Sequence, residues 1–131
     1  MGERQFEVVV GSGDLQPDRG SGVAWGHRWT PGGVVIEADF TGAHLLHLAI
    51  AGCVLNDVHR EAERLGIDID GVRVAAWGGF DTESWRSTGV EYAVDVSSAV
   101  SGAELEELLS IVDDVAEIPL ALRQGAEVRR E

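Results

Sequence analysis

The spacing of apolar and polar residues changes along the chain, and the changes divide it into predicted strands and helices. Residues 6–10, 22–29 and 34–40 are rich in β-branched and aromatic side chains, which is typical of strands. In 34–40 the side chains alternate between one apolar face and one acidic face. Residues 30–33 (Thr-Pro-Gly-Gly) place Pro and Gly where a type II turn needs them, so they predict a hairpin between the last two strands.

A long helix is predicted from residue 43 to residue 65, a stretch without proline. Its first half is apolar on nearly every side, and its second half is amphipathic and charged. Because a helix that is apolar all round is normally buried, the first half is expected in the interior. Gly66 follows as a left-handed terminator. The helix would be roughly 34 Å long, so either it crosses the whole domain or another subunit covers part of it.

A second helix is predicted after Ser101. Ser101 and Glu104 have the spacing of a capping box, in which each side chain satisfies a free backbone N–H of the first turn. Leucine and valine residues then follow at helical spacing, and Pro119 is expected to mark the end of the helix.

Two further strands are predicted at 72–77 and 90–96, and residues 127–129 are expected to close the fold as a short edge strand. The element order is then βββ-α-ββ-α-β, which is an α+β fold. The length of 131 residues fits one domain spanning residues 1–131, and a chain of this size buries about two thirds of its unfolded surface.

The charge balance narrows the function classes. The chain has 23 acidic residues against 10 basic ones, all of them Arg, for a net charge of −13. Such a chain repels nucleic acid and anionic membranes, so neither is an expected partner. The absence of Lys excludes Schiff-base catalysis and a P-loop phosphate site. With one cysteine and no apolar leader, the protein is expected to be cytoplasmic.

The single cysteine, Cys53, lies midway along the long helix and has two interpretations. A buried free cysteine usually packs as a small hydrophobic side chain. A nucleophilic thiolate instead needs a nearby cation or a helix N-terminus to lower its pKa. Asp57, one turn on, would raise that pKa, and Arg60 lies about two turns away. An activating cation is therefore expected from elsewhere in the fold.

His44 and His47 are spaced so that they could share a metal with Glu37 or Asp39. The spacing is a weak signal, because the glutamate base of an HExxH motif is absent. Two histidines at the start of a helix are more often surface or capping residues. No metal and no cofactor are expected.

Four tryptophans are many for a chain with so few aromatic residues. Trp25 and Trp77 are expected in the core, whereas a tryptophan in a loop is a candidate for lining an apolar pocket or a dimer contact. The candidate ligand-binding residues are bulky apolar side chains of the loops and the long helix: Trp29, Trp85, Leu46 and Ile50.

Residues 42–53, Gly-Ala-His-Leu-Leu-His-Leu-Ala-Ile-Ala-Gly-Cys, resemble the OsmC/Ohr-like superfamily of osmotically inducible and organic hydroperoxide resistance proteins. The family motif is roughly Pro-Glu-x-Leu-Leu, followed by an apolar helix that ends Ala-x-Cys. Residues 116–120 fall where the family has a second, Cys-Pro motif. The resemblance covers most of the chain from Val34 onward. It implies an intertwined homodimer with the cysteine-bearing helices at its centre and active sites at the subunit interface.

The resemblance also implies a chemistry. In active members the first cysteine attacks a peroxide as a thiolate and becomes a sulfenic acid, which a second cysteine resolves as a disulfide. Arg and Glu assist, and an apolar pocket accepts organic hydroperoxides. By this resemblance Cys53 is the catalytic, peroxide-attacking residue. Ile118 stands at the resolving position and Ala43 at that of the motif Glu, while Arg19 and Arg28 are candidates for the activating Arg.

Three hypotheses follow. The first is a one-cysteine hydroperoxide reductase in which Cys53 is oxidised to sulfenic acid and an external thiol restores it. The second is an OsmC-like dimer that binds a small apolar ligand and has lost peroxidase activity. The third, weaker hypothesis is a structural or regulatory partner protein.

Overall fold

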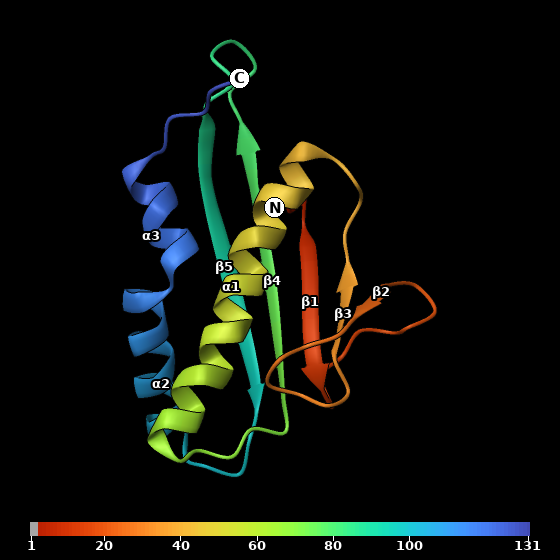
Figure 1. Cartoon of the computed structure of the whole chain (residues 1–131), viewed down its shortest axis with the longest axis vertical. Coiled ribbons are helices and arrows are strands. Elements are labelled where there is room, and N and C mark those ends of the chain that lie inside the picture. The colour runs from red at the N-terminus through yellow and green to blue at the C-terminus, as the bar shows by residue number, and fades with distance from the viewer. Residues whose placement is uncertain (1–2) are drawn as a thin grey trace.

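A computed structural model describes residues 3–131 of the protein. It contains an antiparallel five-stranded sheet in the order β2-β3-β1-β4-β5, with α1 lying across one face and α2 and α3 beside α1 (Figure 1). The elements are β1 (Val8–Gly13), β2 (Val23–Trp25), β3 (Val34–Glu37), α1 (Gly42–Leu65), β4 (Gly71–Phe80), β5 (Ser87–Ser97), α2 (Gly102–Val115) and α3 (Glu117–Gln124). The α+β class and the order βββ-α-ββ-α are as predicted.

The core lies between the sheet and the helices. In β1, β3, β4 and β5 the even-numbered residues point toward α1, because side chains alternate between the two faces of a sheet. In β2 the register reverses the parity, since Trp25 is paired with Val34. The register places Val10 opposite Ile36 on one side and Val74 on the other. The fully buried side chains of this layer are mostly valines and leucines: Val8, Val54, Leu55, Val58, Val72, Val74, Leu108 and Val112. The opposite face of β5 carries exposed acidic residues.

Both ends of α1 are capped. The Thr41 hydroxyl accepts a hydrogen bond from the His44 backbone N–H at 3.2 Å. Gly66 adopts the left-handed conformation with φ of 72°, and its N–H donates to the last turn. The predicted terminator is therefore confirmed.

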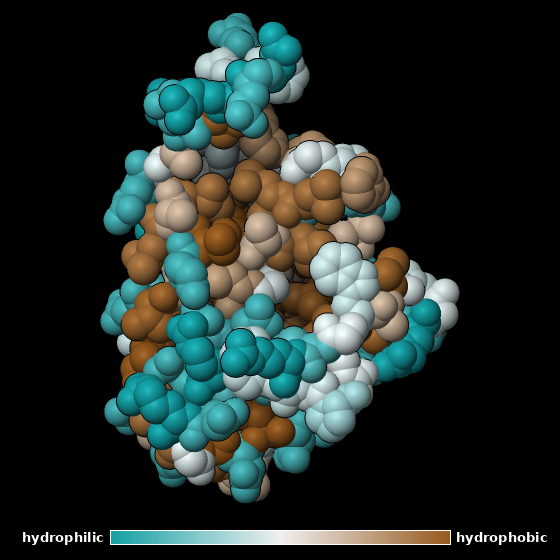
Figure 2. Space-filling view, viewed as in Figure 1, coloured by the Kyte–Doolittle hydropathy of each residue, from teal (hydrophilic) through white to brown (hydrophobic). Residues whose placement is uncertain are grey.

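The burial of α1 differs from the prediction. The apolar first half is the less covered half, since Leu45 is 39% exposed, whereas the charged second half buries Asp57, His59 and Glu61 to 8% exposure or less. The second half is enclosed by the sheet on one side and by α2 on the other. Apolar residues gather on the visible surface over the N-terminal half of α1 (Figure 2).

The C-terminal part of the prediction was wrong in two respects. The second helix ends at Val115, and the extended Ala116 leads directly into α3. Pro119 lies in the first turn of α3, where a missing N–H costs no helical hydrogen bond. Residues 127–129 form no strand and are exposed.

The two tryptophans expected in the core are not buried there. Trp25 is 61% exposed because β2 is an edge strand of the sheet. Trp77 faces away from the helices, where its indole Nε1 donates to Glu91 at 3.1 Å and Arg4 lies 3.8 Å above the ring. The odd position of Trp77 in β4 puts it on the outer face. Within the described residues, no helix combines the length and apolar character needed to cross a bilayer.

Candidate functional site

Cys53 lies on the side of α1 that meets the start of α3. Its Sγ donates to the Glu117 Oε2 atom at 3.6 Å, and one atom each of Cys53, Asp57 and Glu117 lie within 4.8 Å of one another. Burial raises the pKa of the Cys53 thiol, and the negative charges of Asp57 and Glu117 raise it further, against a lowering contribution from the Ile118 backbone. Because the ordinary thiol pKa already lies above neutral, Cys53 is held in its protonated form.

The cation near Cys53 is Arg60, but carboxylates surround it. Its guanidinium lies 3.2 Å from Asp57 Oδ2, 3.6 Å from Glu117 Oε1 and 3.5 Å from Glu61 Oε2. Burial raises the pKa of Asp57 to about 6, although Arg60 opposes the shift. Backbone hydrogen bonding at the start of α3 lowers the pKa of Glu117. It therefore costs less free energy for this pair of carboxyl groups to carry one negative charge than to carry two.

Cys53, Asp57 and Glu117 form the one group among the described residues whose ligand atoms are close enough to hold a metal ion. Arg60 already lies against both carboxylates, so an ion there would have to displace it. The two histidines considered from the sequence are used otherwise. His44 Nδ1 bonds the Thr41 hydroxyl, and His47, which is fully buried rather than at the surface, donates from Nδ1 to the Phe6 carbonyl at 2.9 Å.

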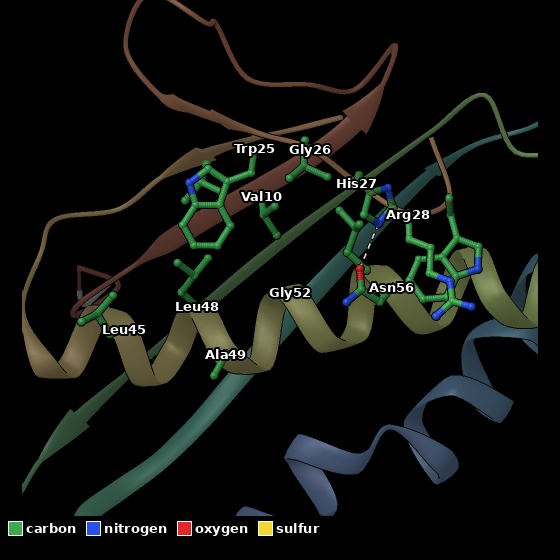
Figure 3. Close-up of a pocket in the computed structure, with 14 residues that line it drawn as sticks. Val10, Trp25, Gly26, His27, Arg28, Leu45, Leu48, Ala49, Gly52 and Asn56 are labelled. Carbon is green, nitrogen blue, oxygen red and sulfur yellow. Dashed lines mark hydrogen bonds between the residues drawn. The ribbon is translucent and has the colours of Figure 1, made fainter. Parts of the chain in front are cut away.

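A cavity of about 480 Å³ lies on another side of α1, between the helix, the inner face of the sheet and residues 25–29 (Figure 3). We call it the α1 pocket. Its walls are mainly apolar, and its polar groups come from three residues, His27, Arg28 and Asn56. The apolar lining consists chiefly of Val10, Trp25, Trp29, Val34, Ile36, Leu45, Leu48 and Leu55. Its volume falls within the range of small-molecule sites, roughly 300–1,000 Å³.

The polar side of the α1 pocket is held in place by hydrogen bonds. His27 Nε2 bonds Asn56 Oδ1 at 2.9 Å, and His27 Nδ1 bonds the Thr30 hydroxyl at 2.8 Å. The ring of His59 meets His27 edge to face at 5.4 Å, and its Nε2 bonds the buried Ser12 hydroxyl at 2.8 Å. Burial, aided by His27, lowers the pKa of His59 to about 4, so His59 is neutral at physiological pH.

Cys53 lies next to pocket residues in the sequence but does not line the α1 pocket. Leu48, Gly52 and Asn56 follow one another at the spacing of one helix face and line the pocket. Leu45 and Ala49, on the neighbouring row of the helix, also line the pocket, whereas Cys53 and Asp57, which continue that row, lie beside Glu117 at the start of α3. The thiol is therefore not among the groups that line this cavity.

The structure separates the site residues predicted from the sequence. Arg28 and Trp29 line the α1 pocket, while Leu46 and Ile50 line a second cavity of about 360 Å³ between α1, β5 and α3. The other two candidates lie outside both cavities. Arg19 donates to the Gly32 carbonyl at 2.8 Å, and Trp85 is 72% exposed in the β4–β5 turn.

Sequence reasoning missed two sets of residues. Glu117, the partner of the thiol, is the neighbour of Ile118 at the resolving position, but only the fold shows that α3 starts beside Cys53. Trp25 and Asn56 were also missed as pocket residues. The signal for Asn56 was present, since it continues the 48–52–56 stripe of the helix.

Comparisons with known proteins agree on the fold. The family pattern described as "OsmC-like protein" matches residues 37–131. An OsmC-like protein from Mycoplasma pneumoniae is similar in structure with a TM-score of 0.60 and 18% identity, over 64% of this chain and 62% of that one. An OsmC-like hydroperoxide resistance protein from Jannaschia sp. CCS1 is similar with a TM-score of 0.53 and 13% identity, over 96% and 93%. The comparison with curated proteins found no match.

Proposed function

The chain belongs to the OsmC-like protein family, and we propose that it is a member that binds a small apolar molecule in the α1 pocket and has no peroxidase activity. The observation that carries the proposal is the separation of the two sites. The α1 pocket has a mainly apolar lining that does not include Cys53, whose thiol donates a hydrogen bond to a carboxylate at the start of α3. A ligand in the pocket would meet aromatic and aliphatic side chains and no nucleophile.

The electrostatics of Cys53 support the same choice. A peroxide-attacking cysteine requires a lowered pKa, because the thiolate is the nucleophile. Burial and the two neighbouring carboxylates instead raise the pKa of this thiol. Arg60, the nearby cation, is paired with those carboxylates.

A one-cysteine hydroperoxide reductase is the second candidate function, and one observation favours it. The thiol of Cys53 is only partly buried and points at Glu117, a carboxylate that could take its proton. In that reaction the sulfur would attack the peroxide, yielding a sulfenic acid and an alcohol, and an external thiol would restore Cys53. The similarity in fold to an OsmC-like hydroperoxide resistance protein also supports this candidate.

We also propose that the chain works as a homodimer. Apolar side chains remain exposed on the first half of α1 and on α3, where Leu45, Ile118 and Leu122 are each 37–42% exposed. Figure 2 shows apolar surface gathered over the first half of α1. A second copy covering these side chains would remove this apolar surface from water. Light scattering tests the assembly, and a monomer of 14.0 kDa at micromolar concentration would contradict it.

One experiment separates the two functions. Calorimetry would measure the binding of cumyl alcohol to the wild type and to Gly52→Leu, because Gly52 lines the α1 pocket and has open space before it. Filling that space should weaken binding at least tenfold. The control is Gly102→Leu, at an equally open glycine in the first turn of α2. Unchanged binding by Gly52→Leu would contradict the assigned pocket.

In parallel, cumene hydroperoxide would be added to the wild type and to Cys53→Ser, with a dimedone reagent to trap sulfenic acid. Our proposal predicts no labelling of Cys53 and equal, background consumption of peroxide by both proteins. Labelling of Cys53 together with thiol-dependent turnover that Cys53→Ser abolishes would overturn it in favour of the reductase.

A further inference from the structure

The α1 pocket has a different chemical character at its two ends. Trp25, Leu45 and Leu48 gather toward the start of α1, and His27, Arg28 and Asn56 lie farther along the helix (Figure 3). The first group offers apolar surface and the second offers hydrogen-bonding groups with one permanent positive charge. A ligand that fits both ends is amphipathic rather than uniformly apolar.

The charge at the polar end stands out against the rest of the chain. The protein carries 23 acidic residues, yet none of them lines the α1 pocket. Arg28 is its one charged side chain. Where acidic residues are so common, a cavity without them is the surface that least repels an anion.

Arg28 is also free to take a partner. Among residues 3–131 it makes no ion pair, in contrast to Arg60, which is surrounded by carboxylates. Its guanidinium lies 5.6 Å from the centre of the Trp29 ring. Glu63 borders a neighbouring hollow outside the pocket and stays beyond ion-pair distance. One unpaired guanidinium matches one carboxylate in geometry as well as in charge, because its N–H groups pair with the two oxygens.

The second polar group at this end is fixed. Both nitrogens of His27 are already hydrogen-bonded, to Thr30 and to Asn56. Asn56 accepts from the ring through its oxygen, which leaves its amide N–H groups available to donate. An anionic head at this end would thus meet a guanidinium and an amide donor, and no acidic group.

We propose that the ligand of the α1 pocket is an apolar molecule with a single carboxylate, whose head pairs with Arg28 and whose tail lies against Trp25 and Leu48. This inference rests on the proposed binding function and specifies its ligand class. It gives Arg28, which the sequence offered as an activator of Cys53, the role of counter-ion to the ligand. A dianion such as a phosphate monoester is less suited, because one guanidinium balances one charge.

Four probes with the same eight-carbon tail test the inference by calorimetry: octanoate, octan-1-ol, octylammonium and octyl phosphate. We expect octanoate to bind most tightly, about fivefold more tightly than octan-1-ol, the size of one partly exposed charged hydrogen bond. Arg28→Gln should remove this difference by weakening octanoate binding to the level of octan-1-ol. Arg86→Gln, which removes an exposed arginine of the β4–β5 turn, should preserve the preference, and circular dichroism checks the fold of both variants.

The outcomes are distinguishable. Equal affinities for octanoate and octan-1-ol, or tighter binding of octylammonium or octyl phosphate, would overturn the carboxylate inference and leave apolar binding intact. A carboxylate preference that survives Arg28→Gln would also overturn it. If none of the four probes binds, the proposed binding function fails as well.

Discussion

Asp57 is the residue whose substitution tests the electrostatics of the Cys53 region most directly. It is 3% exposed, and its Oδ2 receives no hydrogen bond even though Arg60 lies 3.2 Å away. A buried carboxylate in this position is costly when ionised, and Glu117 adds a second negative charge nearby. Asp57→Asn keeps the shape of the side chain and removes the charge. We expect this variant to be more stable than the wild type above pH 7.

The magnitude follows from the pKa. The pKa of Asp57 is raised from 3.8 in the unfolded chain to about 6 in the folded protein, mainly by burial. The folded state therefore binds the proton more tightly, so the stabilising contribution is present below pH 3.8 and is lost as pH rises through about 6. At about 1.4 kcal/mol per pKa unit, ionisation costs the folded state about 2 to 3 kcal/mol.

Urea denaturation at several pH values gives the free energy of unfolding. The pH range, about 3.5 to about 8, brackets the folded and unfolded pKa values of Asp57, which lie ~2 units apart. The difference between Asp57→Asn and the wild type should be near zero at the acidic end and rise to about 2 kcal/mol at the alkaline end. Asp68→Asn, at an exposed aspartate after α1, is the matched control and should show no such rise. A variant that is equally destabilised at both ends would refute the reasoning, because the ion pair with Arg60 would then outweigh the cost of burial.

Three further predictions concern single groups. In the wild type, the free energy of unfolding should fall as the pH drops from 6.5 to about 4, because burial lowers the pKa of His59 and the folded state resists its protonation. His59→Gln should reduce this fall, measured by urea denaturation; an unchanged dependence of the free energy on pH would contradict the prediction. Gly66→Ala should lower the free energy of unfolding by about 1 kcal/mol, because φ is 72° there, and a neutral effect in thermal unfolding would show that the cap tolerates a side chain. Glu117→Gln should lower the pKa of Cys53 and speed its alkylation by iodoacetamide at pH 8, since Glu117 raises that pKa; slower alkylation would show that Glu117 activates the thiol.

Local patterns in the sequence predicted most of the helices and strands. The alternation in 34–40, the absence of proline across 43–65 and the glycine after Leu65 predicted strand, helix and terminator, because each depends on neighbours in sequence. Ser101 caps α2 as its spacing indicated, accepting from the Glu104 N–H at 3.2 Å. These features are decided within a few residues, so the sequence is sufficient for them.

Burial and the site were less predictable, because they depend on which elements meet. The charged half of α1 is buried by other elements, since His59 bonds Ser12 of β1 and Asp57 lies beside Glu117 of α3, and no pattern within α1 records these contacts. Pro119 indicated a helix end, yet it begins a third helix that brings Glu117 to Cys53. The resemblance correctly identified the family and offered Arg19 and Arg28 as activators of Cys53, whereas only the fold shows that Arg19 bonds the Gly32 carbonyl and that Arg28 lines the α1 pocket.

The order of the strands in the sheet also bears on how the chain folds. The central strand, β1, is synthesised before the other four strands, and its first partner, β3, follows before α1. Its other edge stays open until β4 arrives, since Val10 pairs with Val74 and all of α1 lies between them. Pairings between residues so distant in sequence slow folding, and an unpaired valine-rich edge invites association between chains. Refolding should therefore be limited by the docking of β4, and a chain truncated before residue 71 should aggregate.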